Sequence, residues 1–226
     1  MRDTKDYSSK TLKGHNLAWL VATLVLDFLA LLVLAFHTTI HDLTPTWMAA
    51  IRASLTALLP IPALILSSLI SADYKAVLVF WRFKHPLPGS RAFSVYAPAD
   101  PRIDLTKLEK NVGTFPVSER DQNSKWYGLY RQVDSEPSVV DSHKNYLLFR
   151  DVAAMSLLLV PVLPIAMHFN DIDLTRILSS TAWFLGQYLV TAIAGRTTGM
   201  RFVQNVLAVH ASRKVIGARA TTTRTS

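Results

Sequence analysis

The sequence predicts an all-α integral membrane protein with four transmembrane helices and a small, mainly helical cytosolic insert between spans two and three. Half of the 226 residues are hydrophobic, and they concentrate in four runs that are each long enough to cross ~30 Å of hydrocarbon. The only long polar segment lies between the second and third runs. Basic residues are absent from two of the connections between runs and frequent elsewhere, which is typical of a multi-pass protein.

The first run, Leu17 to Phe36, contains a single charged residue, Asp27, near its middle. A carboxylate in hydrocarbon costs about 2.5–3.5 kcal/mol on insertion scales, so we expect Asp27 to be partnered, protonated or in contact with water. A secretory signal peptide is the alternative for this run, because four basic residues precede it and Val33-Leu34-Ala35 resembles a cleavage site. The length of the run and its internal charge favour a retained helix.

The second run, Trp47 to Ile70, carries Arg52 in its first turns and two prolines in its middle. Asp27 and Arg52 are expected at depths that an arginine side chain can bridge, which leaves two interpretations open. They form an ion pair that joins neighbouring helices, or they line a polar path for ions or protons. Arg52 can also extend to the interface alone. The candidate lining residues are Asp27, Arg52, Ser54, Thr56 and Gln187.

The insert, residues 72–146, is predicted to be an interfacial helix followed by a small cytosolic domain. Its first stretch, Tyr74 to Phe83, mixes aromatic residues with cations that we expect to face anionic lipid. Two short helices are then expected, around Ile103 to Leu108 and around Trp126 to Val133. The insert is too small for a strong core of its own, so we expect it to pack against the membrane-proximal helices or other copies.

From Pro137 a helical pattern continues without a break into the third run, Leu147 to Met167, which contains Pro161 and Pro164. A short acidic turn leads to the fourth run, Leu174 to Gly195, and a separate surface helix is expected after it. The predicted domains are an N-terminal cytosolic arm (1–16), a transmembrane hairpin (17–71), the insert (72–146), a second hairpin (147–195) and a C-terminal helix and tail (196–226).

Other polar residues border or enter these runs. Arg150 and Asp151 are expected at the cytosolic boundary as a topological anchor, since charges cost little at that depth. Gln187, Ser180 and Thr191 form a polar stripe along the fourth run. Hydrogen bonding between helices is the alternative to a pore lining for this stripe.

The distribution of the basic residues predicts the orientation. All 24 Lys and Arg except Arg52 and Arg176 fall before the first run, from Lys75 to Arg150, or after the fourth run. The positive-inside rule then predicts a multi-pass protein of the cell inner membrane with both termini cytosolic. The same rule accounts for most of the net charge of +8, which in a soluble protein would suggest binding to nucleic acid or to an acidic partner.

We predict no enzyme activity, no cofactor and no metal site. The chain lacks Cys, and none of the HExxH, GxSxG, P-loop or GxGxxG patterns occurs. His37 and His41, next to Asp42, are a conceivable pair of ligands for a divalent metal ion, although such a pair in a loop is usually solvated.

The basic and aromatic residues of the insert suggest an anionic, phosphate-rich ligand bound by ion pairing and stacking. Acidic residues interleave with them, so a merely solvated face is the alternative. The densest group of cations lies beside the rigid Pro-Leu-Pro turn at 86–88. The candidate ligand- or partner-binding residues are Arg82, Lys84, Arg91, Trp126 and Arg131.

Four spans, cytosolic termini, a small basic insert and no catalytic motif resemble the compact membrane proteins of bacterial antiphage defence operons, of the Hailong channel effector or Kiwa membrane subunit type. The stretches HPLPGSRAF, DPRIDLTKL and WYGLYR look like a family signature. The resemblance implies a homo-oligomer whose membrane part disturbs ion gradients when a cytosolic trigger or an operon-encoded soluble partner engages it. It assigns no role to any residue.

Three classes of function are therefore open: a gated oligomeric pore or membrane-perturbing effector, a passive scaffold for a soluble partner, and a membrane-embedded enzyme. The charge of Asp27 and the prolines within the runs favour the first class. The absence of catalytic motifs disfavours the third. We predict an oligomeric, ion-channel-like effector that contacts membrane lipid and is controlled through its basic cytosolic domain.

Overall fold

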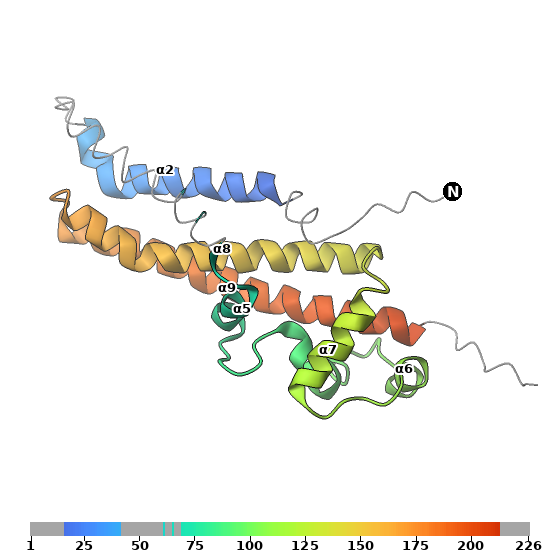
Figure 1. Ribbon diagram of the computed structural model, residues 1–226. Helices are drawn as coiled ribbons and strands as arrows, with labels where there is room; N and C mark the ends of the chain where they lie inside the picture. The colour runs from blue at the N-terminus through green and yellow to red at the C-terminus, as the bar shows by residue number, and fades with distance from the viewer. Residues whose placement is uncertain (1–15, 42–60, 62–64, 66–68, 213–226) are drawn as a thin grey trace, which may run out of the picture.

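The computed structural model describes residues 16–41, 61, 65 and 69–212, and within them the fold is all-helical with no strand. Three long helices run side by side: α2 (Leu17–His41), α8 (Pro137–His168) and α9 (Leu174–Ser212) (Figure 1). Shorter elements gather against α8 and α9. These are α5 (Ala72–Phe80), the 3-10 helix η1 (Pro88–Arg91), the π-helix η2 (Ala92–Tyr96), α6 (Leu105–Val112) and α7 (Glu119–Tyr130).

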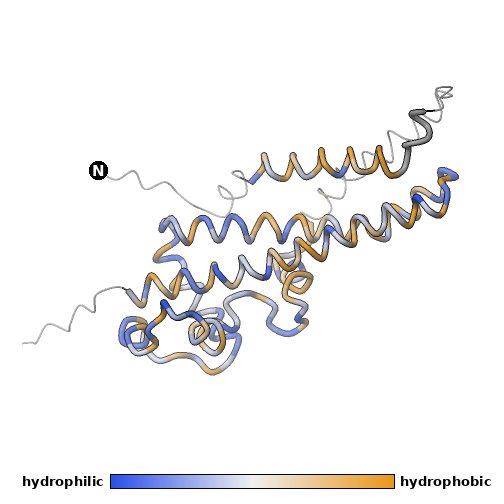
Figure 2. Tube along the Cα trace, turned by 180° about the vertical axis from the view of Figure 1, so that it is seen from behind, coloured by the Kyte–Doolittle hydropathy of each residue, from blue (hydrophilic) through white to orange (hydrophobic). Residues whose placement is uncertain are grey.

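Two helices, α8 with 32 residues and α9 with 39, are long and apolar enough to cross a membrane. Hydrophobic residues follow α2 and the stretches of α8 and α9 beside it, whereas the turn between α8 and α9 is hydrophilic (Figure 2). The predicted all-helical class is confirmed for the described residues. Four membrane crossings stay a prediction, because most of the second run, including Arg52, Ser54 and Thr56, lies outside them.

α8 forms as the sequence predicts. Pro137 stands at the first helical position, where its missing N–H has no partner within a helix in any case. The helix then continues through Pro161 and Pro164 to His168. One continuous helix therefore includes both the third apolar run and the polar residues that precede it.

α9 differs from the prediction. The fourth run and the amphipathic segment after it form one helix of 39 residues, not a span followed by a separate surface helix. Val203, Val206 and Leu207 near its end are fully buried in the main core. Periodicity shows that a helix has an apolar face, but lipid and protein cover such a face equally well. Here the face is covered by protein.

Residues 72–136, here called the side domain, supply that cover. The rings of Trp126 and Tyr130 on α7 pack edge-on against Phe202 of α9, each with centroids 5.1 Å apart, and Phe202 stacks on His143 of α8 at 4.4 Å. Burial raises the pKa of Tyr130 to about 12, and its hydroxyl lies 3.1 Å from Nδ1 of His143. The side domain thus shares its core with α8 and α9, as predicted from its size.

The stretches HPLPGSRAF and WYGLYR are in contact. The N–H groups of Phe93 and Ser94 both donate to Oε1 of Gln122 on α7, at 3.1 Å. Gly89 faces the ring of Trp126, and a Cβ placed at this glycine would lie only 2.4 Å from a ring carbon. No residue with a side chain fits at Gly89 unless Trp126 moves. The two stretches therefore form one packed unit, which explains the Gly in the first.

Gly89→Ala is expected to lower the free energy of unfolding by about 1–3 kcal/mol, because the added methyl group overlaps the Trp126 ring and forces local repacking. Gly128→Ala is the matched control, since a Cβ at this α7 glycine meets nothing within 4 Å. It is expected to stabilise the helix by ~0.5–1 kcal/mol. Thermal unfolding of the detergent-solubilised variants measures both changes. A Gly89→Ala protein as stable as the Gly128→Ala protein would contradict this packing.

α5 occupies the place of the predicted interfacial helix, but its cation does not face lipid. Lys75 is 3% exposed and pairs with Asp151 of α8 at 2.9 Å, which corrects the prediction for this residue. Lys75 is enclosed because α5 packs closely against the long helices. At its contact with α9, a Cβ placed at Gly195 would lie only 3.1 Å from Val79 of α5. Tyr74, on the outer side of α5, stays exposed.

Candidate functional site

Asp27 lies on the face of α2 that packs against α8 and α9, and its side chain is fully buried. Leu31, one turn further along the same face, packs in a core cluster with Met155 of α8 and Phe184 of α9. Neither carboxylate oxygen of Asp27 has a hydrogen-bond partner among the described residues. A buried carboxylate in this state is costly, so Asp27 is the first candidate for a functional group.

Two other buried polar atoms without a partner in the described part of the chain lie on α9. They are Oγ of Ser180 and Oε1 of Gln187, seven residues apart and hence on the same face of the helix. The Gln187 side chain approaches the Asp27 carboxylate without reaching hydrogen-bond geometry. We call Asp27, Ser180 and Gln187 the inner polar cluster. Its atoms have hydrogen-bonding capacity that the described residues do not use.

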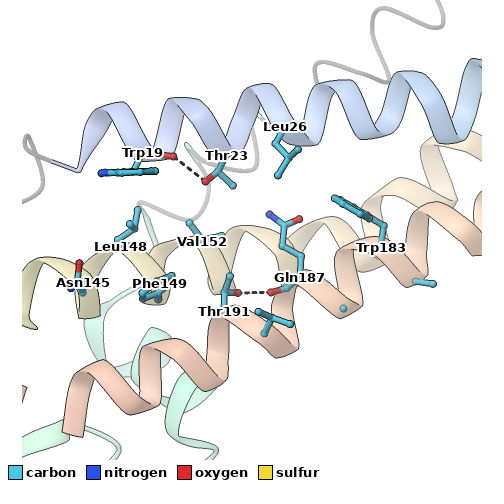
Figure 3. Close-up of a pocket in the computed structure, with 13 residues that line it drawn as sticks. Trp19, Thr23, Leu26, Asn145, Leu148, Phe149, Val152, Trp183, Gln187 and Thr191 are labelled. Atoms are coloured by element: carbon cyan, nitrogen blue, oxygen red, sulfur yellow. Dashed lines mark hydrogen bonds between the residues drawn. The ribbon is translucent and has the colours of Figure 1, made fainter. Parts of the chain in front are cut away.

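A groove of about 780 Å³ opens beside the cluster, with α2 on one side and α8 and α9 on the other (Figure 3). The Gln187 amide projects into it towards α2 (Figure 3). Two hydroxyl groups on the wall are satisfied within their own helices, Thr23 by the carbonyl of Trp19 at 2.9 Å and Thr191 by that of Gln187 at 2.6 Å. Gln187 also lines the groove, and its Oε1 is buried without a hydrogen-bond partner among the described residues. Most other lining residues are apolar, among them Leu26, Leu148, Phe149, Val152, Trp183 and Val190.

The structure brings together two of the five predicted lining residues, Asp27 and Gln187. Arg52, Ser54 and Thr56 lie outside the described residues, and so does the predicted pair of Asp27 with Arg52. The side chains of His37 and His41, the conceivable metal pair, are not described either. Among the described residues, no group of three His, Asp or Glu is placed to hold a metal ion.

A second buried polar group lies where α5 meets α8. Lys75 of α5 and Arg150 of α8 both donate to Oδ1 of Asp151, Lys75 at 2.9 Å and Arg150 at 3.1 and 2.9 Å. The Arg150 guanidinium also lies 5.6 Å from the centre of the Tyr146 ring. Their side chains are 3%, 8% and 11% exposed for Lys75, Arg150 and Asp151. Arg150 and Asp151 are thus buried parts of an ionic cluster, and their expected role as a topological anchor at the cytosolic boundary stays a prediction. Sequence reasoning missed Lys75 as the third member.

The predicted ligand-binding residues of the insert have different surroundings. Trp126 is 4% exposed within the core, so its ring is not available for stacking on a ligand, which corrects that prediction. Arg82 is held by Glu119, whose two oxygens lie 2.8 and 3.0 Å from one guanidinium nitrogen. Lys84 and Arg131 are exposed, and Arg91 is half-buried.

A polar pocket of about 490 Å³ lies between α9 and the turn that follows η2. Arg102 binds the Asp100 carboxylate through Nη2 at 2.7 Å and reaches Asn205 of α9 at 3.0 Å. Its hydrogen bonds hold the pKa of Asp100 below the usual value, against the effect of burial. This contact fastens the turn to α9.

The fold and these groups define an all-helical protein with two helices suited to crossing a membrane and a buried polar cluster between helices. Comparison of the chain with models of protein families, with curated proteins and with solved structures finds no match.

Proposed function

We propose that the protein crosses the inner membrane four times, assembles as a homo-oligomer, and conducts ions or otherwise breaches the bilayer under the control of its cytosolic part. The observation that carries this proposal is the inner polar cluster. Asp27 on α2 and Ser180 and Gln187 on α9 bury atoms with no hydrogen-bond partner in the described part of the chain. A role in antiphage defence is what the resemblance in plan implies.

Polar atoms of this kind are expensive in hydrocarbon and tend to mark ion paths or contacts between helices. A single copy of four helices has little interior beyond its own side chains, so a polar path is more easily built between copies around a symmetry axis. The groove beside the cluster is mainly apolar, and the Gln187 side chain, with its unpartnered Oε1, is one of its lining residues. A helix of a neighbouring copy that packs there would meet Gln187.

The structure offers a way for the side domain to control the membrane part, because the two share helices. α8 and α9 each continue from the inner polar cluster into the core of the side domain. The ionic cluster of Lys75, Arg150 and Asp151 joins α5 to α8 next to that core. A rearrangement of the side domain therefore acts on α5, α8 and α9 together, as in switches between two packings of similar free energy.

The four-span topology has its own test. Reporter fusions after Thr44 and at Asp171, in the turn between α8 and α9, are expected to be extracytoplasmic. Fusions at Lys125 and Thr222 are expected to be cytosolic, since basic residues are retained on that side. A cytosolic location of the reporter after Thr44 would contradict the first transmembrane hairpin and therefore the four-span topology.

The function is tested by mass measurement or cross-linking of the detergent-solubilised protein, together with the membrane potential of cells that express it. We expect a closed oligomer and a loss of membrane potential when the protein is produced alone or with the products of its neighbouring genes. A stable monomer that leaves the potential unchanged in both cases contradicts the proposal and favours the scaffold.

A further inference from the structure

Three arginines from separate parts of the chain converge beyond the end of α5. Arg82 follows α5, Arg91 ends η1, and Arg196 lies on α9, where its guanidinium is 5.8 Å from the centre of the Trp81 ring. α9 passes close to α5 here, because Gly195 lies against Val79. We call Arg82, Arg91 and Arg196 the arginine cluster.

The positive charges of all three arginines act on the side chain of Tyr96. It is 8% exposed, and this burial raises the pKa of its hydroxyl. The positive charges of Arg91, Arg196 and Arg82 lower the pKa of this hydroxyl. The negative charge of Glu119 raises it, as burial does. These three cations and one carboxylate are therefore each close enough to Tyr96 to influence its hydroxyl.

The carboxylate is already engaged, because Glu119 contacts Arg82 with both oxygens. Arg91 and Arg196 have no carboxylate partner in the part of the chain that the structure describes. Arg196 is exposed and Arg91 is half-buried, so neither residue is enclosed in the core. Clustered like charges repel one another, and an added anion relieves that repulsion.

The position of the cluster along α9 favours a ligand near the membrane. Arg196 directly follows Gly195, the last residue of the fourth apolar run. Trp81 donates its Nε1 hydrogen to the Tyr188 hydroxyl at 3.1 Å, and that hydroxyl donates to the carbonyl of Leu78 at 2.9 Å. Trp81, although its ring is held by this hydrogen bond, is still 48% exposed. An anchored tryptophan beside arginines is typical of the headgroup layer of a bilayer.

We propose that Arg91 and Arg196, supported by Arg82 and the Trp81 ring, bind a phosphate group. Guanidinium forks suit phosphate oxygens, with which they form paired, charge-assisted hydrogen bonds. The phosphate belongs to an anionic lipid headgroup or to a soluble phosphate compound. This site differs from the one expected from sequence. It includes Arg196 and Trp81, and it excludes Lys84, Trp126 and Arg131. It goes beyond the proposed conduction and does not depend on it.

The test uses the full-length protein in detergent with two probes. Native mass spectrometry measures retention of added phosphatidylglycerol, and calorimetric titration measures binding of inorganic pyrophosphate to lipid-free protein. In Arg91→Gln/Arg196→Gln, binding of the recognised probe is expected to weaken at least ~10-fold, because two charge-assisted contacts are lost. The matched control, Arg131→Gln/Arg201→Gln, removes the same charge from exposed positions and is expected to stay within about two-fold of the wild type.

Selective loss of phosphatidylglycerol identifies a lipid headgroup as the source of the phosphate, and selective loss of pyrophosphate binding identifies a soluble compound. Binding of neither probe, or equal losses in both double variants, overturns the proposal. Should the glutamine variant fail to fold, Arg91→Lys/Arg196→Lys keeps both charges without the planar forks. Its binding is expected to fall several-fold below wild type, and unchanged binding there also overturns the proposal.

Discussion

Asp151→Asn is expected to lower the free energy of unfolding by about 3–5 kcal/mol, a large share of the total for a protein of this size. Asp151 Oδ1 accepts hydrogen bonds from both Lys75 and Arg150, and both cations are almost completely buried. Without the carboxylate, two positive charges remain close together in a poorly solvated place. Breaking a buried ion pair on one side is costly for this reason.

Two further variants separate this effect from a general intolerance of change. Asp141→Asn, at an exposed position of α8, is expected to change stability by at most ~0.5 kcal/mol. The triple variant Lys75→Met/Arg150→Met/Asp151→Leu is expected to regain most of the loss, since apolar groups of similar size carry no desolvation penalty. Denaturation of the solubilised protein, followed by tryptophan fluorescence, gives all three values. A triple variant less stable than Asp151→Asn would show that packing, not charge, governs the site.

Local patterns were sufficient to predict much of the fold. The start of α8 at Pro137 and its continuation into the third run follow from proline geometry and hydrophobic periodicity, which depend only on neighbouring residues. The two short helices around Leu108 and Trp126 were predicted for the same reason and correspond to α6 and α7.

The errors concern what covers an apolar face. The end of α9 and the α5 helix both have compositions that suit a membrane surface, yet in the structure the side domain covers Val206, and α8 supplies a carboxylate for Lys75. Composition does not distinguish lipid from protein as the neighbour. The pairing of Lys75 with Asp151 joins positions 76 residues apart, which one sequence without relatives does not reveal.

For the sites, too, local features of the sequence were predicted and contacts between distant segments were not. Asp27 and Gln187 were predicted because a polar residue in an apolar run is conspicuous by itself. The groove between α2 and the α8–α9 pair was not predicted, nor was the approach of Arg196 to Trp81, because both depend on how distant segments pack. Trp126 was wrongly expected at a binding surface, since an aromatic residue suits a core as well as a ligand.

Asp27→Leu is expected to make the protein more stable and to abolish its effect on membrane potential. Its carboxylate is fully buried without a hydrogen-bond partner among the described residues, and Leu31 and Phe184 lie close by in an apolar cluster. Leucine removes the cost of the charge, for which ~2.5–3.5 kcal/mol on the insertion scale is an upper estimate of the gain. A gain in stability with loss of activity is the usual signature of a residue retained for function.

The control is Thr23→Val on the groove wall, one turn before Asp27, because its hydroxyl already bonds the Trp19 carbonyl of its own helix. This variant is expected to keep both stability and membrane activity, which shows that the groove tolerates a change of polarity at a neighbouring position. Thermal unfolding of solubilised protein and a potential-sensitive dye in expressing cells supply the two measurements. The opposite result, a less stable Asp27→Leu protein that Arg52→Leu restores, would identify a structural ion pair between the first two runs. In that case the role of the inner polar cluster would be to hold helices together, and it would no longer support the proposal that the protein conducts ions.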